Sequence, residues 1–553
     1  MQATRPALRA AASDAAAQAA RAASASAAAP PRLRKQAPTV AILGAGITGL
    51  VAAHRLAAKG IRVRLFEKTS RAGGVIRTTR EGGWLVEHGP NSLLDSAPHG
   101  AALRALIAEL RLESQLVYAS PDAKNRYLVR GGRLVAAPTS PLGFMRTPLL
   151  SAAAKCRVVG ELFRRRSKPP RAEDTSLADF VGAHFGQEVV DALLGPFVSG
   201  VYAGDPQRLS ARHAFPTLWQ AEQSHGSLLR AQIAKMRQAR ASDQPRPRLF
   251  SFRDGLQSLI DALVQSLPQG SLQLGAQVRS LTPPSSANGA WKITVTKRAA
   301  EHTKPANAAS HARASDSPGA PGGSATPDPR DEVLCEELAD AVICALPAHA
   351  LAALQIGDSH PLATLAEIEH PPVSALFLGY RRAQIAHPLD GFGMLVPAVE
   401  KLPLLGVIFT STLFPGRAPA GHVALHVMLG GAGQRELTAL PPLPPDELLA
   451  RVSPALEQTL GLQRDGKTTR CGRTEGREGG EPVFMQHQHW PRAIPQYNLG
   501  YEKHLGAMAA CEARYPGLFI GGQCRGGIST PACIHSGETL AAQAAAHTPE
   551  HAF

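Results

Sequence analysis

The sequence predicts an α/β fold in which a βαβ unit is combined with inserted lobes. Thr39–Leu43 is a short run of β-branched and apolar residues, and apolar residues from Leu50 to Ala58 recur at helical spacing. Ile61–Phe66 then alternates between polar and apolar residues like a second strand. Together these segments have the length of a βαβ unit, about 30 residues. The chain has 553 residues, more than one hydrophobic core usually organises, so we expect two or three lobes.

A glycine-rich turn joins the first predicted strand to the predicted helix. In Gly44-Ala45-Gly46-Ile47-Thr48-Gly49, the first glycine permits the tight turn and the second lets backbone approach a pyrophosphate. The third glycine lets helix and strand pack closely, and the helix N-terminus offers free N–H groups. Glu67 follows the second strand, 18 residues beyond Gly49, where a carboxylate can accept hydrogen bonds from a ribose. The turn alone would be weak evidence, but the whole arrangement predicts a dinucleotide site.

Two more glycine-rich regions indicate which dinucleotide is bound. Arg71–Arg77 contains a Gly-Gly pair and is followed by Glu87-His88-Gly89-Pro90-Asn91, and near the C-terminus Leu518–Gly522 leads into Gly526–Thr530. This arrangement resembles the amine-oxidase-like flavoproteins, which implies FAD as the cofactor and a Rossmann-like FAD-binding domain. The cofactor-binding residues implied by the turn and by the resemblance are Gly44, Ala45, Gly46, Ile47, Thr48, Gly49, Glu67, Lys68, Gly74, Val75, Gly89, Pro90, Asn91, Ser92, Val278, Ile528, Ser529 and Thr530.

A narrower resemblance comes from segments outside the nucleotide motifs. These segments are Asn125–Tyr127, Gly195–Asp205, Phe215–Glu222, Phe252–Leu259, Gly391–Pro397, Val427–Gly431 and Ile494–Tyr497. In this order they resemble the oxygen-dependent, FAD-containing protoporphyrinogen oxidases. The resemblance implies oxidation of protoporphyrinogen IX to protoporphyrin IX in haem biosynthesis, with oxygen as acceptor and hydrogen peroxide as product.

The same resemblance implies a substrate site. Arg126 would bind a propionate, which a guanidinium can hold through two hydrogen bonds. Phe392, Leu395, Ile408 and Met428 would line an apolar slot, and Gly200 would allow close approach of a ring edge. Hydride transfer would be centred on the flavin. No side chain stands out as a general base and we expect no metal, so no catalytic residue is predicted.

The resemblance covers about residues 38–545 and implies a discontinuous organisation. An inserted α+β substrate domain and a helical, membrane-associating lobe would interrupt the FAD-binding domain. We assign residues 38–118, 249–298, 334–350 and 490–546 to the FAD-binding domain, 119–139 and 351–489 to the substrate-binding domain, and 140–248 to the helical lobe. Local patterns predict a helix over Pro98–Leu116, a hairpin over Arg126–Leu134 that turns at Gly131-Gly132, and a last helix over Ser536–Ala546.

Charge is concentrated in two segments. The net charge is +15, and residues 1–40 and 151–172 contribute +11 of it. The apolar stretch Leu142–Leu150, with Phe144, Met145, Leu149 and Leu150, precedes the second segment, which indicates a monotopic surface on an anionic leaflet. A solvated basic loop is the alternative. Aromatic residues make up 5% of the chain, which argues against a nucleic-acid surface built on base stacking.

Two segments are predicted to lie outside the folded domains. Residues 1–37 are rich in Ala, Arg and Ser and nearly free of acids, which is typical of an organellar transit peptide, with a disordered tail as the alternative. We therefore expect a peripheral protein of the mitochondrial inner membrane, with a plastid as the alternative. Residues 299–331 lack large apolar residues and are predicted to be a disordered insertion. Whether the protein forms a homodimer stays open.

Other functions within and outside this class stay open as well. An amine oxidase would need an aromatic cage, for which Tyr497 is the only candidate, and a carotenoid desaturase would not need a cation such as Arg126. A non-catalytic FAD-binding protein is the third possibility.

Overall fold

The computed structural model describes residues 37–96, 98–165, 173–241, 247–286, 289–298, 332–438, 441–462 and 480–548. The predicted leader, except residue 37, and the predicted insertion at 299–331 lie outside these residues. So do Arg166, Lys168 and Arg171 of the second basic segment.

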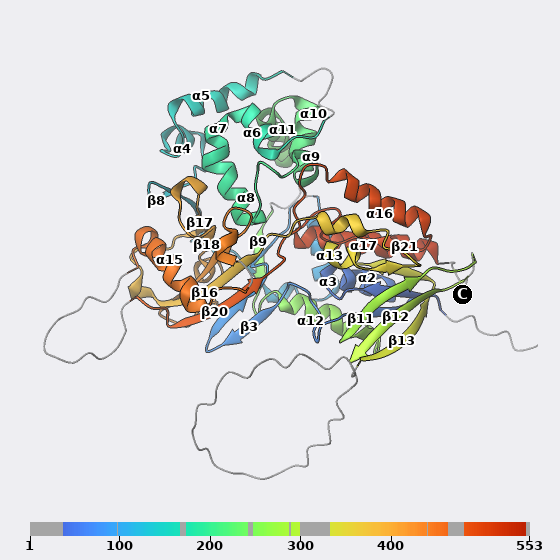
Figure 1. The fold of residues 1–553 in the computed structure, drawn as a ribbon. Helices are drawn as coiled ribbons and strands as arrows, with labels where there is room; N and C mark the ends of the chain where they lie inside the picture. Colours follow the sequence, from blue (N-terminus) through green and yellow to red (C-terminus); the bar gives the residue numbers. More distant parts are fainter. Residues whose placement is uncertain are drawn as a thin grey trace, which may run out of the picture.

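A five-stranded parallel sheet gathers strands from both ends of the chain (Figure 1). Its strands, in spatial order, are β10 (Leu272–Gln273), β2 (Arg62–Phe66), β1 (Thr39–Leu43), β14 (Ala341–Cys344) and β21 (Leu518–Ile520). Val40 pairs with Val63 on one side and with Ala341 on the other. Both faces of the sheet are buried, because Val40 and Ile42 join one core while Ala41 and Leu43 join another. This explains why the strands read as nearly continuous apolar runs.

Helices and smaller sheets cover this sheet. α2 (Ile47–Ala57) packs against α17 (Thr530–His547), so segments far apart in the sequence lie side by side. The other helices around this sheet are α3 (Gly100–Glu109), α12 (Gln257–Gln265), α13 (Ala348–Ala352) and α16 (Glu502–Arg514). The smaller sheets contain β3 (Thr78–Glu81) with β4 (Trp84–Glu87); β5 (Leu93–Leu94), β9 (Leu249–Phe252) and β6 (Leu116–Tyr118); and β13 (Glu332–Ala339), β12 (Trp291–Arg298), β11 (Ala276–Thr282) and β15 (Gln355–Ile356).

Three sequence expectations are corrected here. The predicted helix Pro98–Leu116 is α3 followed by a short 3-10 turn at Glu113–Gln115, because Arg111 adopts a left-handed φ of 56° and ends α3. The last helix begins six residues before Ser536, because the Ser529 side chain caps it by accepting from the Ala532 N–H. Residues 351–368 belong with the five-stranded sheet and not with the substrate-binding domain. β15 pairs with β11, and Leu362 and Leu365 join the core that contains Ala41 and Leu43 of the five-stranded sheet.

A seven-stranded sheet forms the second half of the molecule. Its order is β20 (Phe484–Trp490), β16 (Val373–Arg381), β19 (His422–Gly430), β18 (Gly406–Ile408), β17 (Gly391–Leu395), β7 (Asn125–Arg130) and β8 (Arg133–Ala136). The predicted hairpin is confirmed as β7 and β8, with φ of 58° at Gly131 and 72° at Gly132. One face packs on α15 (Pro445–Leu460) through residues such as Val427 and Val452. On the opposite face, Phe377 and Ala424 pack against Trp84 and Val86 of β4, whereas Leu395, Ile408 and Met428 are only partly buried.

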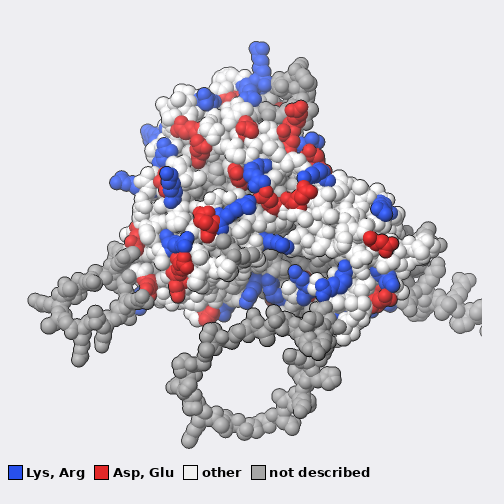
Figure 2. Space-filling view, in the orientation of Figure 1, with Lys and Arg blue, Asp and Glu red and all other residues white. Residues whose placement is uncertain are grey.

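A helical lobe lies above the two sheets in Figure 1. It contains α4 (Pro141–Arg146), α5 (Ala152–Gly160), α6 (Leu177–Phe185), α7 (Gln187–Val189), α8 (Gly195–Tyr202), α9 (Ala211–Ala214), α10 (Pro216–His225) and α11 (Leu228–Ala241). In the part of the chain that the structure describes, no helix is both long and apolar enough to span a bilayer. Figure 2 shows Lys and Arg side chains on the visible face of the molecule mixed with Asp and Glu side chains, without one continuous basic patch.

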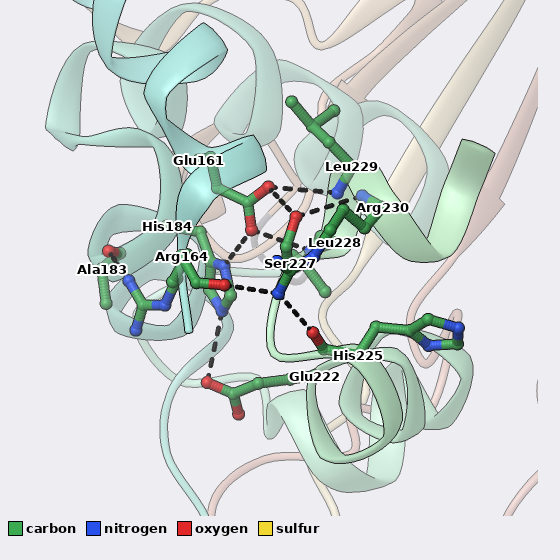
Figure 3. Close-up of polar contacts among 10 residues, drawn as sticks. All are labelled: Glu161, Arg164, Ala183, His184, Glu222, His225, Ser227, Leu228, Leu229 and Arg230. Atoms are coloured by element: carbon green, nitrogen blue, oxygen red, sulfur yellow. Dashed lines mark hydrogen bonds and ion pairs between the residues drawn. The ribbon is translucent and has the colours of Figure 1, made fainter. Parts of the chain in front are cut away.

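A buried polar network holds the helical lobe together (Figure 3). His184 Nδ1 lies 2.7 Å from Glu161 Oε1, and His184 Nε2 lies 3.3 Å from Glu222 Oε1. Glu161 also accepts hydrogen bonds from Ser227 Oγ and from the first backbone N–H groups of α11, including that of Leu228. The carboxylate therefore caps α11 and links it to α6 and α10.

Candidate cofactor and substrate site

The turn after β1 has the geometry that its glycines predict. Gly44 adopts φ of 96°, and a Cβ on Gly49 would lie 1.9 Å from the Gly44 carbonyl oxygen. At Gly46, in contrast, a Cβ would meet no protein atom within 4 Å. Gly46 is the N-cap of α2, and this helix has no side-chain cap and no acid in its first turn. The turn thus combines free N–H groups, a positive helix end and open space, which suits a phosphate group.

The second glycine-rich loop lies against this turn. Gly73 N donates to Ala45 O at 2.8 Å, and a Cβ on Gly74 would lie 3.4 Å from Gly46 Cα. Arg71 holds this loop in place by donating to its own backbone carbonyls, including that of Ile76 at 3.1 Å. Arg71 is not among the cofactor residues predicted from the sequence, although its position before a Gly-Gly pair could have suggested such a role.

The loop after β4 joins the same region. A Cβ on Gly89 would lie 2.1 Å from the Val75 carbonyl oxygen, so these two loops can approach each other only because residue 89 is glycine. Val75 is 39% exposed, and Pro90, Asn91 and Ser92 continue this loop as half-buried residues.

Glu67 lies at the end of β2, beside the turn. Its Oε2 accepts from Ala45 N at 3.0 Å, and its Oε1 accepts from Thr69 N and Oγ1 at 3.0 and 2.8 Å. Lys68 follows as an exposed residue, and Glu67 O accepts from Ala276 N two residues before Val278. The carboxylate is therefore held at the carboxyl end of the parallel strands, where nucleotides bind in such folds.

The C-terminal loop meets the N-terminus of α2. Thr48 Oγ1 donates to Cys533 O at 3.1 Å, and Gly522 N donates to Ser536 Oγ at 3.0 Å. A Cβ on Gly537 would lie 2.5 Å from the Thr48 carbonyl oxygen. The N-terminal part of α17, which follows Ile528, Ser529 and Thr530, thus packs directly on the start of α2. Arg525 points away from this junction and binds Glu512 of α16 at 2.8 Å.

The face of the seven-stranded sheet opposite α15 carries the predicted slot residues. Leu395 lies opposite Gly406 across β17 and β18, and Gly406 lies opposite Met428 across β18 and β19. Side chains alternate along a strand, so Leu395 and Met428 point away from the core that holds Met394. A Cβ on Gly200 of α8 would lie 2.3 Å from Leu395 Cδ2, which places the helical lobe directly over this face.

Arg126 and Ile408 belong to the next row on that face. Arg126 lies opposite Gly393 across β7 and β17, and Gly393 lies opposite Ile408. The Arg126 guanidinium carbon is 5.7 Å from the centroid of the Phe392 ring. Arg126 is exposed, and within the described part of the chain no acidic side chain forms an ion pair with it. The structure therefore brings the six predicted substrate residues to one region: an apolar face with a cation at its edge.

Comparison with known proteins gives the family. Residues 47–545 match the family model of the flavin containing amine oxidoreductases. The chain belongs to this family. It is 31% identical to a mitochondrial protoporphyrinogen oxidase of Nicotiana tabacum, over 91% of this chain and 93% of that protein. It is also 30% identical to a protoporphyrinogen oxidase of Homo sapiens, over 91% and 97%.

Solved structures agree on the fold. A crystal structure from Exiguobacterium sp. 255-15, provisionally named a protoporphyrinogen oxidase, has a TM-score of 0.66 at 22% identity and covers 91% of this chain and 98% of its own. Cyclohexylamine oxidase from Brevibacterium oxydans IH-35A has a TM-score of 0.60 at 14% identity, covering 92% and 99%. As a flavin containing amine oxidoreductase, this protein is an oxidoreductase with FAD as its cofactor. The open space at Gly46 and the uncapped start of α2 fit that cofactor.

Two buried histidines of this amine oxidoreductase family member, one in the loop after β4 and one in β19, are close enough for their charges to interact. His88, in the loop after β4, is buried, and its Nε2 lies 2.9 Å from Thr79 Oγ1. Burial, together with the charges of Arg77 and Arg71, lowers the pKa of His88 to about 4. His426 of β19 is also buried, and burial, then the neighbouring His88, lowers its pKa to about 4. Both rings are therefore neutral at physiological pH.

His426 is not among the residues predicted from the sequence, because a single histidine in an apolar strand gives no motif. The sequence gives no sign either of the ion pair between Arg417 and the buried Glu87, which joins the loop before β19 to the β3–β4 hairpin. A cavity of about 260 Å³ lies elsewhere, between Val129, Leu149 and Glu188, and none of the predicted site residues lines it.

Proposed function

We propose that this flavoprotein oxidises protoporphyrinogen IX to protoporphyrin IX with oxygen as electron acceptor and hydrogen peroxide as product. The observation that carries the proposal is the apolar face around Leu395 and Met428 with Arg126 at its edge. This combination suits a large apolar macrocycle with propionate groups. The relatives named protoporphyrinogen oxidase support the same substrate over nine tenths of the chain.

The roles of the residues follow from their positions. Arg126 would bind a propionate and orient the ring system, and Phe392, Leu395, Ile408 and Met428 would enclose it. FAD, when bound, supplies the acceptor for hydride removal from a methylene bridge. Its pyrophosphate would lie over Gly46 and Gly74, and Glu67 would exchange its present contacts for the ribose hydroxyls. The loops at Gly89 and Ile528–Thr530 would enclose the remaining part of the cofactor.

One assay tests this proposal. The protein, reconstituted with FAD, is mixed with protoporphyrinogen IX without oxygen and then aerated. We expect red porphyrin fluorescence and peroxide to appear only after air is admitted, beyond one turnover. Flavin-containing protein that produces neither would contradict the proposal.

An amine oxidase is a weaker candidate on structural grounds. Tyr497, the candidate cage residue, is buried and stacks on Tyr501 with ring centroids 4.2 Å apart. Its hydroxyl donates to Gln523 O and accepts from Gly527 N. This tyrosine therefore supports the C-terminal loop and has no free face for an amine. The exposed Arg126 likewise favours an anionic substrate over a carotenoid.

For the cellular setting, we propose a peripheral protein of an organellar membrane. Leu142, Met145 and Phe163 of the helical lobe are 59, 56 and 80% exposed, and these apolar side chains would enter the leaflet. Leu149 and Leu150, which the sequence had suggested for this contact, are buried in the lobe's core instead. The relatives' names include both mitochondrial and chloroplastic proteins, and we favour the mitochondrial inner membrane. Arg164 and Arg165 would add attraction to anionic lipid.

A further inference from the structure

His426 lies on the same face of the sheet as the proposed substrate residues. It lies opposite Ile408 on one side and Phe377 on the other, in the row that begins with Arg126 and Gly393. Met428, two residues along β19, points to the same face. The imidazole therefore belongs to the face of the proposed slot, and its strand neighbours there are apolar.

The ring lacks a hydrogen-bond partner where one is expected. His426 is 4% exposed, and among the described residues its Nδ1 is buried with no partner. Buried polar side-chain atoms in native proteins are nearly always paired, so an unpaired one calls for an explanation. An apolar side chain at this strand position would not incur this cost. The unpaired atom suggests a partner that is present only during function.

The protonation state limits what that partner can be. The His426 ring is neutral. The neighbouring ring of His88, in the loop after β4, is neutral too. A neutral imidazole offers one N–H donor and one acceptor nitrogen and no charge. It cannot attract a carboxylate as Arg126 does, but it can accept a hydrogen bond from a neutral N–H group. In the proposed function, the pyrrole N–H groups of the macrocycle are such donors.

We propose that His426 is a substrate-binding residue that accepts a hydrogen bond from a pyrrole N–H of the porphyrinogen. This inference rests on the proposed function and adds a second polar contact to it. Arg126 fixes the edge of the macrocycle, and His426 fixes its centre, so the two together select one orientation. Protoporphyrinogen has an N–H on each of its four pyrroles, whereas the fully oxidised porphyrin keeps only two. The contact therefore favours the substrate over the product.

The test uses three variants of the full chain loaded with FAD. His426→Phe keeps a planar ring without a nitrogen acceptor, and His426→Gln restores an acceptor and a donor. His504→Phe is the matched control, because His504 is also buried with an unpaired Nδ1 but lies on α16. Initial rates against protoporphyrinogen IX give KM and kcat, and visible absorbance gives the flavin content of each variant.

We expect His426→Phe to raise KM about threefold to tenfold, because one hydrogen bond to the substrate is lost, and to affect kcat less. His426→Gln should recover most of this loss, and His504→Phe should leave KM unchanged. A wild-type KM in His426→Phe would overturn the inference, as would a Gln variant as weak as the Phe variant. Flavin loss from His426→Phe but not from His426→Gln would also overturn it, because the ring would then serve the cofactor. Wild-type protein that forms no porphyrin would instead overturn the proposed function itself.

Discussion

Arg417 and Glu87 form a buried ion pair where the seven-stranded sheet meets the β3–β4 hairpin. Arg417 Nη1 lies 3.5 Å from Glu87 Oε1, and both side chains are 4% exposed. Burial raises the pKa of Glu87, while Arg417 and the hydrogen bond from Thr78 oppose this shift. Removing either partner would leave the other charge buried without its counter-charge.

Replacing Arg417 with Met should strongly destabilise the protein, because Glu87 would stay buried without its partner. We expect the free energy of unfolding to fall by about 3 kcal/mol, the lower end for breaking a buried pair. Urea unfolding followed by circular dichroism measures this change. The double variant R417M/E87Q should recover part of the loss, and an R417M midpoint equal to the wild type would refute the role given to the pair.

Acidification should weaken the helical lobe through Glu161. Burial would raise the pKa of Glu161, but hydrogen bonds from Ser227, His184 and the α11 backbone outweigh it and lower the pKa below its ordinary 4.5. Because the folded-state pKa is the lower one, the carboxylate contributes stability above pH 4.5 that is lost as pH falls through the folded-state value. Thermal unfolding between pH 6 and pH 3 should show this loss. Glu161→Gln should flatten it, and an unchanged pH dependence would argue against Glu161 as its source.

Replacing Gly46 with Leu should remove the cofactor without unfolding the chain. No protein atom lies within 4 Å of the new Cβ, so the side chain would occupy only the space proposed for the pyrophosphate. We expect purified protein without yellow colour but with nearly wild-type circular dichroism. Gly506 of α16 is the matched control, since it too has open space and no positive φ. Gly506→Leu should stay yellow, and a yellow Gly46→Leu would disprove the phosphate site.

Arg126→Ala should raise KM for protoporphyrinogen IX more than it lowers kcat. A charge-assisted contact to a propionate is worth about 1.5–3 kcal/mol and acts on the bound substrate and the transition state alike. We therefore expect KM to rise about 10- to 100-fold in steady-state assays. Arg126→Lys should lose less, because it keeps the charge without the planar fork. Unchanged kinetics in the Ala variant would remove Arg126 from the site.

Phe163→Asp should reduce binding to vesicles that contain anionic lipid. Its side chain is the most exposed apolar group in the proposed membrane surface, at 80%. Flotation of vesicles with bound protein measures the effect, and 1 M salt should release the wild type only partly. Leu338→Asp is the control, because Leu338 is 64% exposed on β13, outside the helical lobe. If 1 M salt released the wild type completely from the vesicles, the binding would be electrostatic and the proposed apolar contact would be wrong.

Local sequence patterns predicted the elements of the nucleotide site well. β1 has the predicted bounds, and the hairpin turns at the predicted glycines, because apolar runs and paired glycines act over a few residues. Helix ends were less predictable. Arg111 ends α3 by a left-handed φ that no local pattern announces, and Ser529 starts α17 through a cap that was not recognised.

Contacts between distant segments could not be predicted from the residues alone. Glu87 and Arg417 are 330 positions apart, and His88 and His426 are 338 apart, so only the folded sheets bring them together. Leu149 and Leu150 were assigned to a membrane surface from composition, but composition does not tell which side of a segment packs inward. The substrate residues were found through a family resemblance, and sheet register then gave that list a physical basis.

The pairing of β14 with β21 constrains when this protein can become active in the cell. Val342 pairs with Leu518 across these strands, and α17 must then close over α2. Once the first 500 residues have been synthesised, the turn at Gly46 and the proposed substrate residues are present, but β21 and α17, which complete the flavin site, are still missing. The site around Gly46 is therefore complete only after α17 has been synthesised, and a chain that still lacks this helix should be colourless.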